Sequence, residues 1–155
     1  MITPLDITHR ETAQQVLDLQ LPSYRVEAEL TGFDGIPPLR DTVDTLISCG
    51  ETFRGLYLDG ELAGAISYKL EKNLLDIHRV MVHPRHFRKG VATALLQSLL
   101  DSTSEAHRVE VSTGSLNHPA KKLYRRLGFT EVGEEEAAPG FWMTRFQLIR
   151  EGGAG

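Results

Sequence analysis

The stretch that decides the fold is Leu74–Leu100, LLDIHRVMVHPRHFRKGVATALLQSLL. It reads as a buried strand, a proline-marked turn, a basic loop that ends at Gly90, and a helix with an apolar stripe. The loop places Arg85, Arg88 and Lys89 just ahead of the helix N-terminus, where free backbone N–H groups and the helix dipole favour an anion. The stretch therefore predicts a phosphate-binding loop between a strand and a helix.

The composition narrows the class of protein. The chain has 155 residues, 41% of them hydrophobic, which is enough for one domain with its own core. A net charge of -4 argues against a protein that coats nucleic acid, and no apolar run approaches the roughly 18 residues of a membrane span. The single Cys49 and an N-terminus without a secretory pattern favour a reducing, cytoplasmic setting. We expect one domain over residues 1–150 and a flexible tail over 151–155.

The first 50 residues predict a strand followed by helices. Residues 2–7 alternate apolar and polar side chains, as strands do. Thr8, with Glu11 three residues later, forms a capping box and predicts that a helix begins at Thr8. The pattern should break at Pro22 and resume as a bent or second helix. Further expected boundaries are a stop at Gly32 and a short helix capped by Asp41 and ended by Gly50.

From residue 52 the apolar period changes to two, which is typical of strands. Asp59-Gly60 between two apolar runs is a strong hairpin signal, because both turn residues need a positive φ. A second hairpin around Lys72 and Asn73 should deliver the chain into the central strand. After the helix, Arg108–Thr113 alternates again and should lie parallel to that strand through a right-handed crossover.

The last third predicts one helix and two strands. Asn117 is a candidate N-cap, and Gly128 should end the helix. Strands are expected over Phe129–Val132 and Phe141–Leu148, joined by a connection over Glu134–Gly140. The order of strand, helices, three antiparallel strands, helix, strand, helix and two strands predicts an α+β domain with a mixed sheet.

Two sequence runs carry the chemistry. Residues 87–93, FRKGVAT, lack the GxxxxGK[ST] and GxGxxG patterns, so alone they also fit a plain helix start. The run N-x-x-A-x-x-x-Y-x-x-x-G-F, from Asn117 to Phe129, is the second. Together with the strand that ends in His-Pro and the RKGVA loop, it resembles the GNAT superfamily of acyl-CoA-dependent N-acetyltransferases. The resemblance extends over nearly the whole chain by element order, and its motifs lie between Leu74 and Phe129.

The resemblance implies a central mixed, mostly antiparallel sheet of about seven strands flanked by helices, with acetyl-CoA as cosubstrate. The spacing of the histidines suggests no metal site, so no metal is expected. The family's phosphate loop, [QR]-x-x-G-x-[GA], falls on residues 87–92, where Phe87 departs from the usual Gln or Arg and Arg88 is expected to compensate. The central strand should carry a bulge and give a backbone N–H near Met81 or Val82 to the thioester carbonyl, although the same residues also fit a plain core strand. The implied cofactor-binding residues are Val80, Met81, Val82, Arg88, Lys89, Gly90, Val91, Ala92, Thr93, Asn117, Ala120 and Tyr124.

Three residues are candidates for proton transfer. Tyr124 matches the family tyrosine that protonates the departing thiolate, and the reference pKa values of a thiol, about 8.5, and a phenol, about 10, are nearly matched. A core aromatic is the alternative. Asp76 and His78 lie two apart in the central strand, opposite Leu75, Ile77 and Arg79, and are candidate bases for the attacking amine. Histidine is the better base because its reference pKa is about 6.5, while structural hydrogen bonding remains open for both.

The acceptor pocket should involve Tyr24–Pro38 and Glu131–Trp142. Residues Glu134 to Glu136 could attract a cationic amine, or simply form a solvated loop. We expect direct transfer to a small-molecule or peptide amine in a ternary complex, by a monomer or homodimer without nucleic-acid or membrane partners. Two rivals remain open: a noncatalytic acyl-CoA-binding regulatory module, and a small phosphate-ligand or protein-interaction domain.

Overall fold

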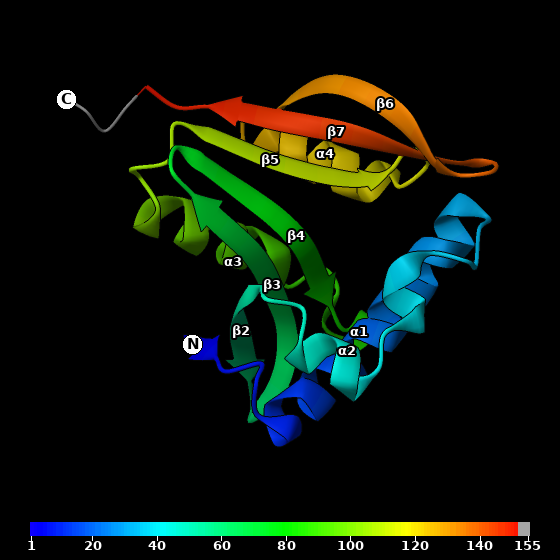
Figure 1. Ribbon diagram of the computed structural model, residues 1–155, viewed down its shortest axis with the longest axis vertical. Coiled ribbons are helices and arrows are strands. Elements are labelled where there is room, and N and C mark those ends of the chain that lie inside the picture. The colour runs from blue at the N-terminus through cyan, green and yellow to red at the C-terminus, as the bar shows by residue number, and fades with distance from the viewer. Residues whose placement is uncertain (152–155) are drawn as a thin grey trace.

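The computed structural model describes residues 1–151, so most of the expected tail lies outside the described residues. Seven strands form one mixed sheet in the order β1-β2-β3-β4-β5-β7-β6 (Figure 1). The strands are β1 (Ile2–Leu5), β2 (Thr52–Leu58), β3 (Glu61–Glu71), β4 (Leu74–Val82), β5 (Arg108–Gly114), β6 (Thr130–Ala138) and β7 (Phe141–Ile149). The helices are α1 (Arg10–Thr31), α2 (Val43–Ile47), α3 (Val91–Ser102) and α4 (His118–Arg126), with 3₁₀ turns η1 (Pro37–Arg40) and η2 (Pro84–His86). The predicted α+β class is confirmed.

The predicted hairpins form as expected. Asp59 and Gly60 adopt φ values of 51° and 78° between β2 and β3, and Lys72 adopts a φ of 50° between β3 and β4. The strands β2, β3 and β4 are consecutive and antiparallel, and β5 lies parallel to β4 after the crossover through α3. Positive φ is tolerated by Asp and Gly far better than by branched residues, which is why this signal is readable from sequence.

The sheet opens between β4 and β5. These strands pair only from Leu74–Arg108 to Asp76–Glu110, whereas β5 pairs with β7 along its whole length, from Arg108–Ile149 to Gly114–Met143. Figure 1 shows the two strands diverging, with the C-terminal part of α1 beside the open end. The second half of β4 therefore has a strand partner on one edge only.

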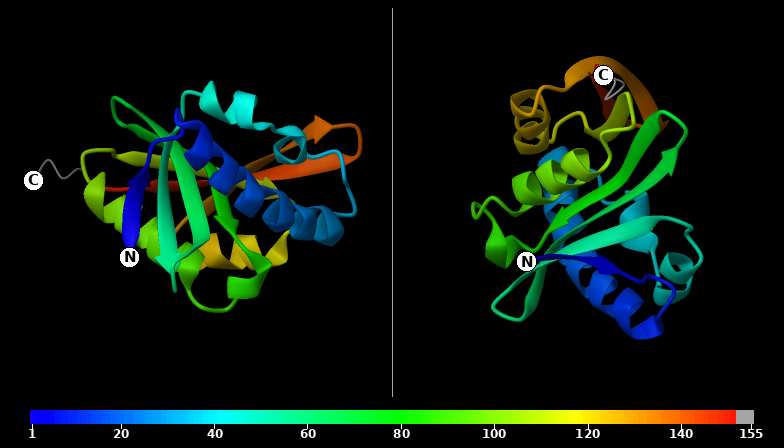
Figure 2. Two further views of the ribbon diagram at one scale, coloured as in Figure 1. Left: turned by 90° about the horizontal axis from the view of Figure 1, so that it is seen from below. Right: turned by 90° about the vertical axis from the view of Figure 1, so that its left-hand side faces the viewer.

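Helices cover both faces of the sheet (Figure 2). On one face, α3 and α4 pack against a core that includes Leu95, Leu99 and Phe146. On the other face, α1 and α2 pack against a separate core that includes Val16, Leu46 and Met81. Each helix presents an apolar stripe to the sheet, and burial of these stripes supplies the main stabilisation of the fold.

A bulge in β4 changes the expected faces. Tyr68 pairs with Ile77 and Ser67 pairs with Arg79, so His78 is the extra residue. The prediction that Arg79 shares a face with Leu75 and Ile77 is therefore wrong, because one extra residue reverses the alternation that follows it. Arg79 instead points to the α1 side, where it binds side chains from α1 and the loops beside it.

Two predicted helix starts near the N-terminus are wrong, and the interruption predicted at Pro22 does not separate two helices. The Thr8 hydroxyl donates to the Asp6 carboxylate at 2.6 Å, so it caps no helix, and α1 begins at Arg10. Pro22 lies inside a continuous α1, because tertiary bonds hold the helix on both sides of it, from Gln20 to the Pro38 carbonyl and from the Val82 N–H to Ser23. The N-cap of α2 is Thr42, not Asp41. The stop at Gly32 is confirmed by its φ of 70°.

The expected connection over Glu134–Gly140 is also wrong, because β6 continues to Ala138 and only a tight turn separates it from β7. Six of its nine residues from Thr130 are glutamate, threonine or glycine, so the strand has no apolar face to produce a two-residue period. Pairing with β7 decides its structure. No helix in residues 1–151 combines the length and apolar character that a membrane span requires.

Candidate active site

A groove of about 600 Å³ lies between the end of β4, the N-terminus of α3 and the first turns of α4. We call it the cosubstrate groove. Most of the cofactor-binding residues expected from the sequence line it, and they come from three separate elements. These are Val80, Val82, Arg88, Gly90, Val91, Ala92, Thr93, Ala120 and Tyr124.

The start of α3 suits an anion. Gly90 is the N-cap with a φ of 73°, and Arg88 before it also has a positive φ of 65°. The first intrahelical bond is donated by Ala94 to the Gly90 carbonyl, so the N–H groups of the three residues between them have no helical partner. These amides and the helix dipole face the cosubstrate groove, and the basic loop adds charge. The residues present therefore fit a pyrophosphate group.

Five expected site residues do not line the cosubstrate groove. Met81 is fully buried in the core beneath α1. The Lys89 ammonium lies 3.1 Å from His86 Nδ1 and is not among the groove-lining residues. Asn117 caps α4 by accepting from the Ala120 N–H and lines a second cavity instead. Asp76 lines neither space but contacts His78, which lines the second cavity.

The free edge of β4 presents backbone donors to the opening. The His83 N–H donates to the Ala63 carbonyl of β3 at 2.8 Å, and the Val82 N–H donates in the other direction, to the Ser23 hydroxyl of α1 at 3.3 Å. Since alternate residues of a strand turn their N–H groups to the same edge, the Val80 N–H also points toward the opening. The backbone N–H of Val80 is therefore directed at the opening, where it can donate to a ligand in the cosubstrate groove.

A second cavity, of about 130 Å³, lies deeper in the opening between β4 and β5. We call it the inner cavity. It shares Val80, Ala120 and Tyr124 with the cosubstrate groove, so these side chains form the boundary between the two spaces. Its other walls come from α1, η1, β5 and β7. The arrangement lets two ligands approach the same point from opposite sides.

Tyr124 is a buried aromatic and also lines both spaces. Its ring packs 5.8 Å from the Phe129 ring and 5.5 Å from the Phe146 ring, measured between centroids. Burial, and then the negative charge of Glu27, raises the pKa of Tyr124 above its ordinary value. The phenol therefore stays protonated near neutral pH. The gap between the pKa of Tyr124 and that of a thiol is wider than the reference values of a phenol and a thiol predict.

His78, the bulged residue, lies between two carboxylates. Its Nε2 lies 3.2 Å from Asp76 Oδ2, and its Nδ1 lies 3.7 Å from Glu51 Oε2. The side chain of His78 lines the inner cavity. The two carboxylates hold the imidazole ring in place at the wall of the inner cavity, where it can meet an amine.

A buried ionic network supports this part of β4. Arg79 donates to both oxygens of Glu51, at 2.9 and 3.1 Å, and to Asp41 at 2.6 Å. Burial alone would raise the pKa of Glu51, but hydrogen bonds from Arg79 and Ser67 outweigh it, so this pKa lies below its usual value. The network ties β4 to the chain before β2 and keeps Glu51 charged beside His78.

Tyr24 and Glu27 were expected only as members of the acceptor range Tyr24–Pro38, with no role for either, and Ser23 was not expected in the site. All three lie on α1, and their helical spacing places them on one face toward the opening. The missing signal was the continuity of α1 through Pro22, without which this face could not be recognised. Glu27 reaches across the opening and accepts hydrogen bonds from Thr113, Gly114 and Asn117.

Comparison with known proteins agrees with this geometry. The model of the acetyltransferase (GNAT) family matches residues 13–129. The chain is 40% identical over 144 residues to the UPF0157 protein YqkA of Bacillus subtilis, covering 92% of the chain and 42% of YqkA. It is 29% identical over 137 residues to the streptothricin acetyltransferase of Streptomyces lavendulae, covering 86% of the chain and 70% of that protein. The chain thus spans less than half the length of YqkA.

Solved structures share the fold. The ribosomal-protein-S18-alanine N-acetyltransferase of Escherichia coli superposes with a TM-score of 0.79 at 17% identity, covering 100% of this chain and 97% of that one. At this identity the likeness concerns the fold alone. The family match, by contrast, includes the β4–α3 loop and the α4 motif that build the cosubstrate groove. The chain therefore belongs to the acetyltransferase (GNAT) family.

Proposed function

We propose that this protein is an N-acetyltransferase that moves an acetyl group from acetyl-CoA to a primary amine by direct transfer in a ternary complex. The observation that carries the proposal is the shared boundary of Val80, Ala120 and Tyr124 between an anion-suited groove and a cavity that holds His78. Family membership supports the same reaction class.

The cosubstrate groove would hold acetyl-CoA, which supplies the activated acetyl thioester. The amides of Val91, Ala92 and Thr93 would bind its pyrophosphate. The Val80 N–H points to the opening and would donate to the thioester carbonyl oxygen, where negative charge develops during attack. This assigns the donor to Val80 in preference to the expected Met81 or Val82, since Met81 is buried and the Val82 N–H already binds Ser23.

Two side chains would handle protons on opposite sides of this boundary. His78 would accept the amine proton directly or through water, with Asp76 holding its ring. Tyr124 would give its proton to the departing thiolate sulfur as the C–S bond breaks and the new C–N bond forms. Because the pKa of Tyr124 is raised, the phenol is present in the protonated form that this step needs.

A covalent acetyl-enzyme is not supported. The single cysteine, Cys49, packs beside the core under α1 and lines neither the cosubstrate groove nor the inner cavity. Burial also raises the pKa of the Cys49 thiol, which lowers its nucleophilicity near neutral pH. Direct transfer needs only the two ligands and the three groups described above.

Two measurements test the proposal. Acetyl-CoA should raise the melting temperature, and thiol release should appear when a suitable amine is added. Absence of any melting shift at millimolar acetyl-CoA would overturn the proposal. A melting shift without thiol release across amino acids, polyamines, aminoglycosides and peptides would favour the noncatalytic binding module. A cytoplasmic location, the single domain over 1–150, and a monomer or homodimer remain predictions.

A further inference from the structure

An amine acceptor would enter through two neighbouring cavities, which we call the acceptor route, and carboxylates line both of them. The inner cavity is lined by one carboxylate, Glu27, and by no lysine or arginine of the described chain. It shares Phe141 with an outer cavity, whose lining holds a second carboxylate, Glu134, and again no basic residue from residues 1–151. Lys121 donates to the Ser115 carbonyl beside the outer cavity but is not among its lining residues. An acceptor on this route meets negative charge at two depths.

Neutral donors, and no counter-ion, hold the Glu27 carboxylate in residues 1–151. Its Oε1 accepts from the Thr113 hydroxyl at 3.1 Å, the Gly114 N–H at 3.3 Å and the Asn117 amide at 3.4 Å. All three donors are neutral, and all three bonds go to one oxygen. Within residues 1–151, Glu27 takes part in no ion pair. A half-buried carboxylate held this way attracts a cation.

Glu51 shows the contrasting case. It lies near the same cavity, but Arg79 neutralises it with a two-pronged ion pair. Glu27 has no such partner, and its negative charge adds to burial in raising the pKa of both Tyr24 and Tyr124. The field of Glu27 therefore extends over the inner cavity, where that of Glu51 is largely cancelled.

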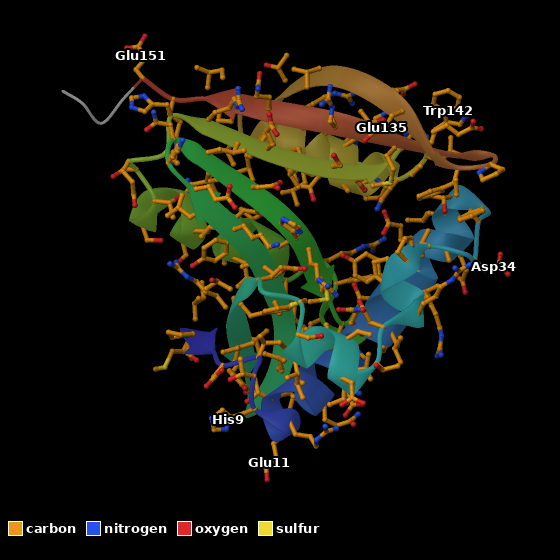
Figure 3. The ribbon with its side chains drawn as sticks, in the orientation of Figure 1. His9, Glu11, Asp34, Glu135, Trp142 and Glu151 are labelled. Carbon is orange, nitrogen blue, oxygen red and sulfur yellow. The ribbon has the colours of Figure 1, made fainter. Side chains whose placement is uncertain are left out.

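The wall between the two cavities is aromatic. Phe33 stacks on Phe141 with 4.8 Å between ring centroids and 15° between planes, and Trp142 follows on the rim with 49% of its surface exposed. Figure 3 shows Trp142 and Glu135 at the end of the β6–β7 hairpin, above the opening. Aromatic faces accommodate both aliphatic chains and cationic groups. A chain with spaced ammonium groups thus finds apolar contact between carboxylates.

We propose that the acceptor is a small amine that carries at least one further cationic group. The reacting amine lies beside His78, the second cation binds Glu27, and any third lies near Glu134 and Trp142. This inference rests on the proposed function and names its substrate class. An acceptor with a carboxylate near the reacting amine is disfavoured, because no lysine or arginine of residues 1–151 lines either cavity to pair with it.

Three acceptors with the same five-carbon chain isolate the charge. These are 1,5-diaminopentane, pentylamine and 5-aminopentanoate, whose second group is positive, apolar or negative. We expect kcat/KM to fall in that order, with about 10- to 100-fold between the first two, the range of one charge-assisted contact. Spermidine and kanamycin, compared at equal concentration, then distinguish a linear from a cyclic polycation as the source of the charge.

Glu27→Gln tests the residue. The amide oxygen still accepts the three hydrogen bonds, so the variant removes the charge with the least structural change. The ratio of kcat/KM for 1,5-diaminopentane to that for pentylamine should fall about tenfold or more. Glu29→Gln is the matched control, since it makes the same change at an exposed position of α1 and should leave the ratio unaltered.

A binding measurement separates this inference from the proposed function. Calorimetry with 1,5-diaminopentane and CoA-saturated protein should give binding that Glu27→Gln weakens by the same factor. Equal use of all three acceptors, or an unchanged ratio in Glu27→Gln, would overturn the cationic substrate class while leaving acetyl transfer intact. Failure of acetyl-CoA to shift the melting temperature would overturn the proposed function, and calorimetry with protein alone would still test the charge preference.

Discussion

Val80 and Tyr124 each line both the cosubstrate groove and the inner cavity, although they come from opposite sides of the opened sheet. Val80 lies on β4. Tyr124 lies on α4, and the Tyr124 ring packs against the Phe146 ring of β7. The spacing of the two is therefore set by how far β4 and β5 diverge. A group held between them would contact a backbone donor on one side and a phenol on the other.

Tyr124→Phe should lower kcat by about 100-fold, because general acid catalysis contributes on that order. The KM for acetyl-CoA and the melting temperature should change little, since the ring and its packing remain. Because burial raises the pKa of Tyr124, the wild-type rate should show no fall from phenol ionisation up to about pH 10. Steady-state kinetics from pH 6 to 10 check this. An unchanged kcat would assign Tyr124 to the core alone.

Replacement of His78 by glutamine should lower kcat/KM for the amine by about 100-fold and flatten the acidic side of the pH–rate profile. Asp76→Asn should have a smaller effect, about tenfold, because it loses only the contact that orients the ring. The pH profile of each variant is the decisive readout. If Asp76→Asn proves as damaging as His78→Gln, the two residues act as one unit; if neither affects the profile, the base lies elsewhere.

Glu51→Gln should destabilise the fold at pH 7 by about 3 kcal/mol, since Arg79 loses one charged partner in a largely buried site and keeps the other, Asp41. The pKa of Glu51 is lowered in the folded state, so its contribution is present above about pH 4.5 and is lost as the pH falls below that value. The stability difference between wild type and variant should therefore shrink from pH 7 to pH 3 in urea titrations. Glu71→Gln, at an exposed position, is the control. A difference that is constant with pH would contradict the ionic explanation.

Gly64→Ala should weaken both the fold and acetyl-CoA binding. A Cβ on Gly64 would lie 2.5 Å from Val91 Cγ1 and 2.8 Å from the Met81 carbonyl oxygen, so the start of α3 or the end of β4 must shift. We expect a loss of about 1–3 kcal/mol and a higher KM for acetyl-CoA. Gly133→Ala is the control, because its Cβ would meet only the flexible Arg145 side chain at 3.3 Å. Thermal melts and kinetics of both variants provide the comparison.

Local signals explain what the sequence could predict. The turn at Asp59-Gly60, the loop before Gly90 and the cap at Asn117 each depend on residues close in the chain, and each is found as expected. The errors lie where distant contacts override local preference. Pro22 stays helical because α1 is held by β4 and η1, and β6 forms because β7 pairs with it.

The candidate site was predictable in part for the same reason. The phosphate loop and Tyr124 lie in contiguous motifs. Glu27, by contrast, belongs to α1 and reaches the site through a hydrogen bond with Thr113, which is 86 residues away in the sequence. A bulge in β4 could be expected from the family resemblance. The face of the sheet to which Arg79 points, however, depends on which residue of β4 is the extra one. No local pattern encodes that position.

The short pairing between β4 and β5 has a consequence for hydrogen exchange. Three residue pairs fasten these strands at one end, and past Asp76 the β5-facing amides of β4 have no strand to protect them. A ligand that enters the opening supplies the protection that a neighbouring strand gives elsewhere in the sheet. The slowing of hydrogen exchange at the Val80 amide therefore measures the fraction of molecules that hold a ligand in the opening. This measurement requires no acetyl transfer.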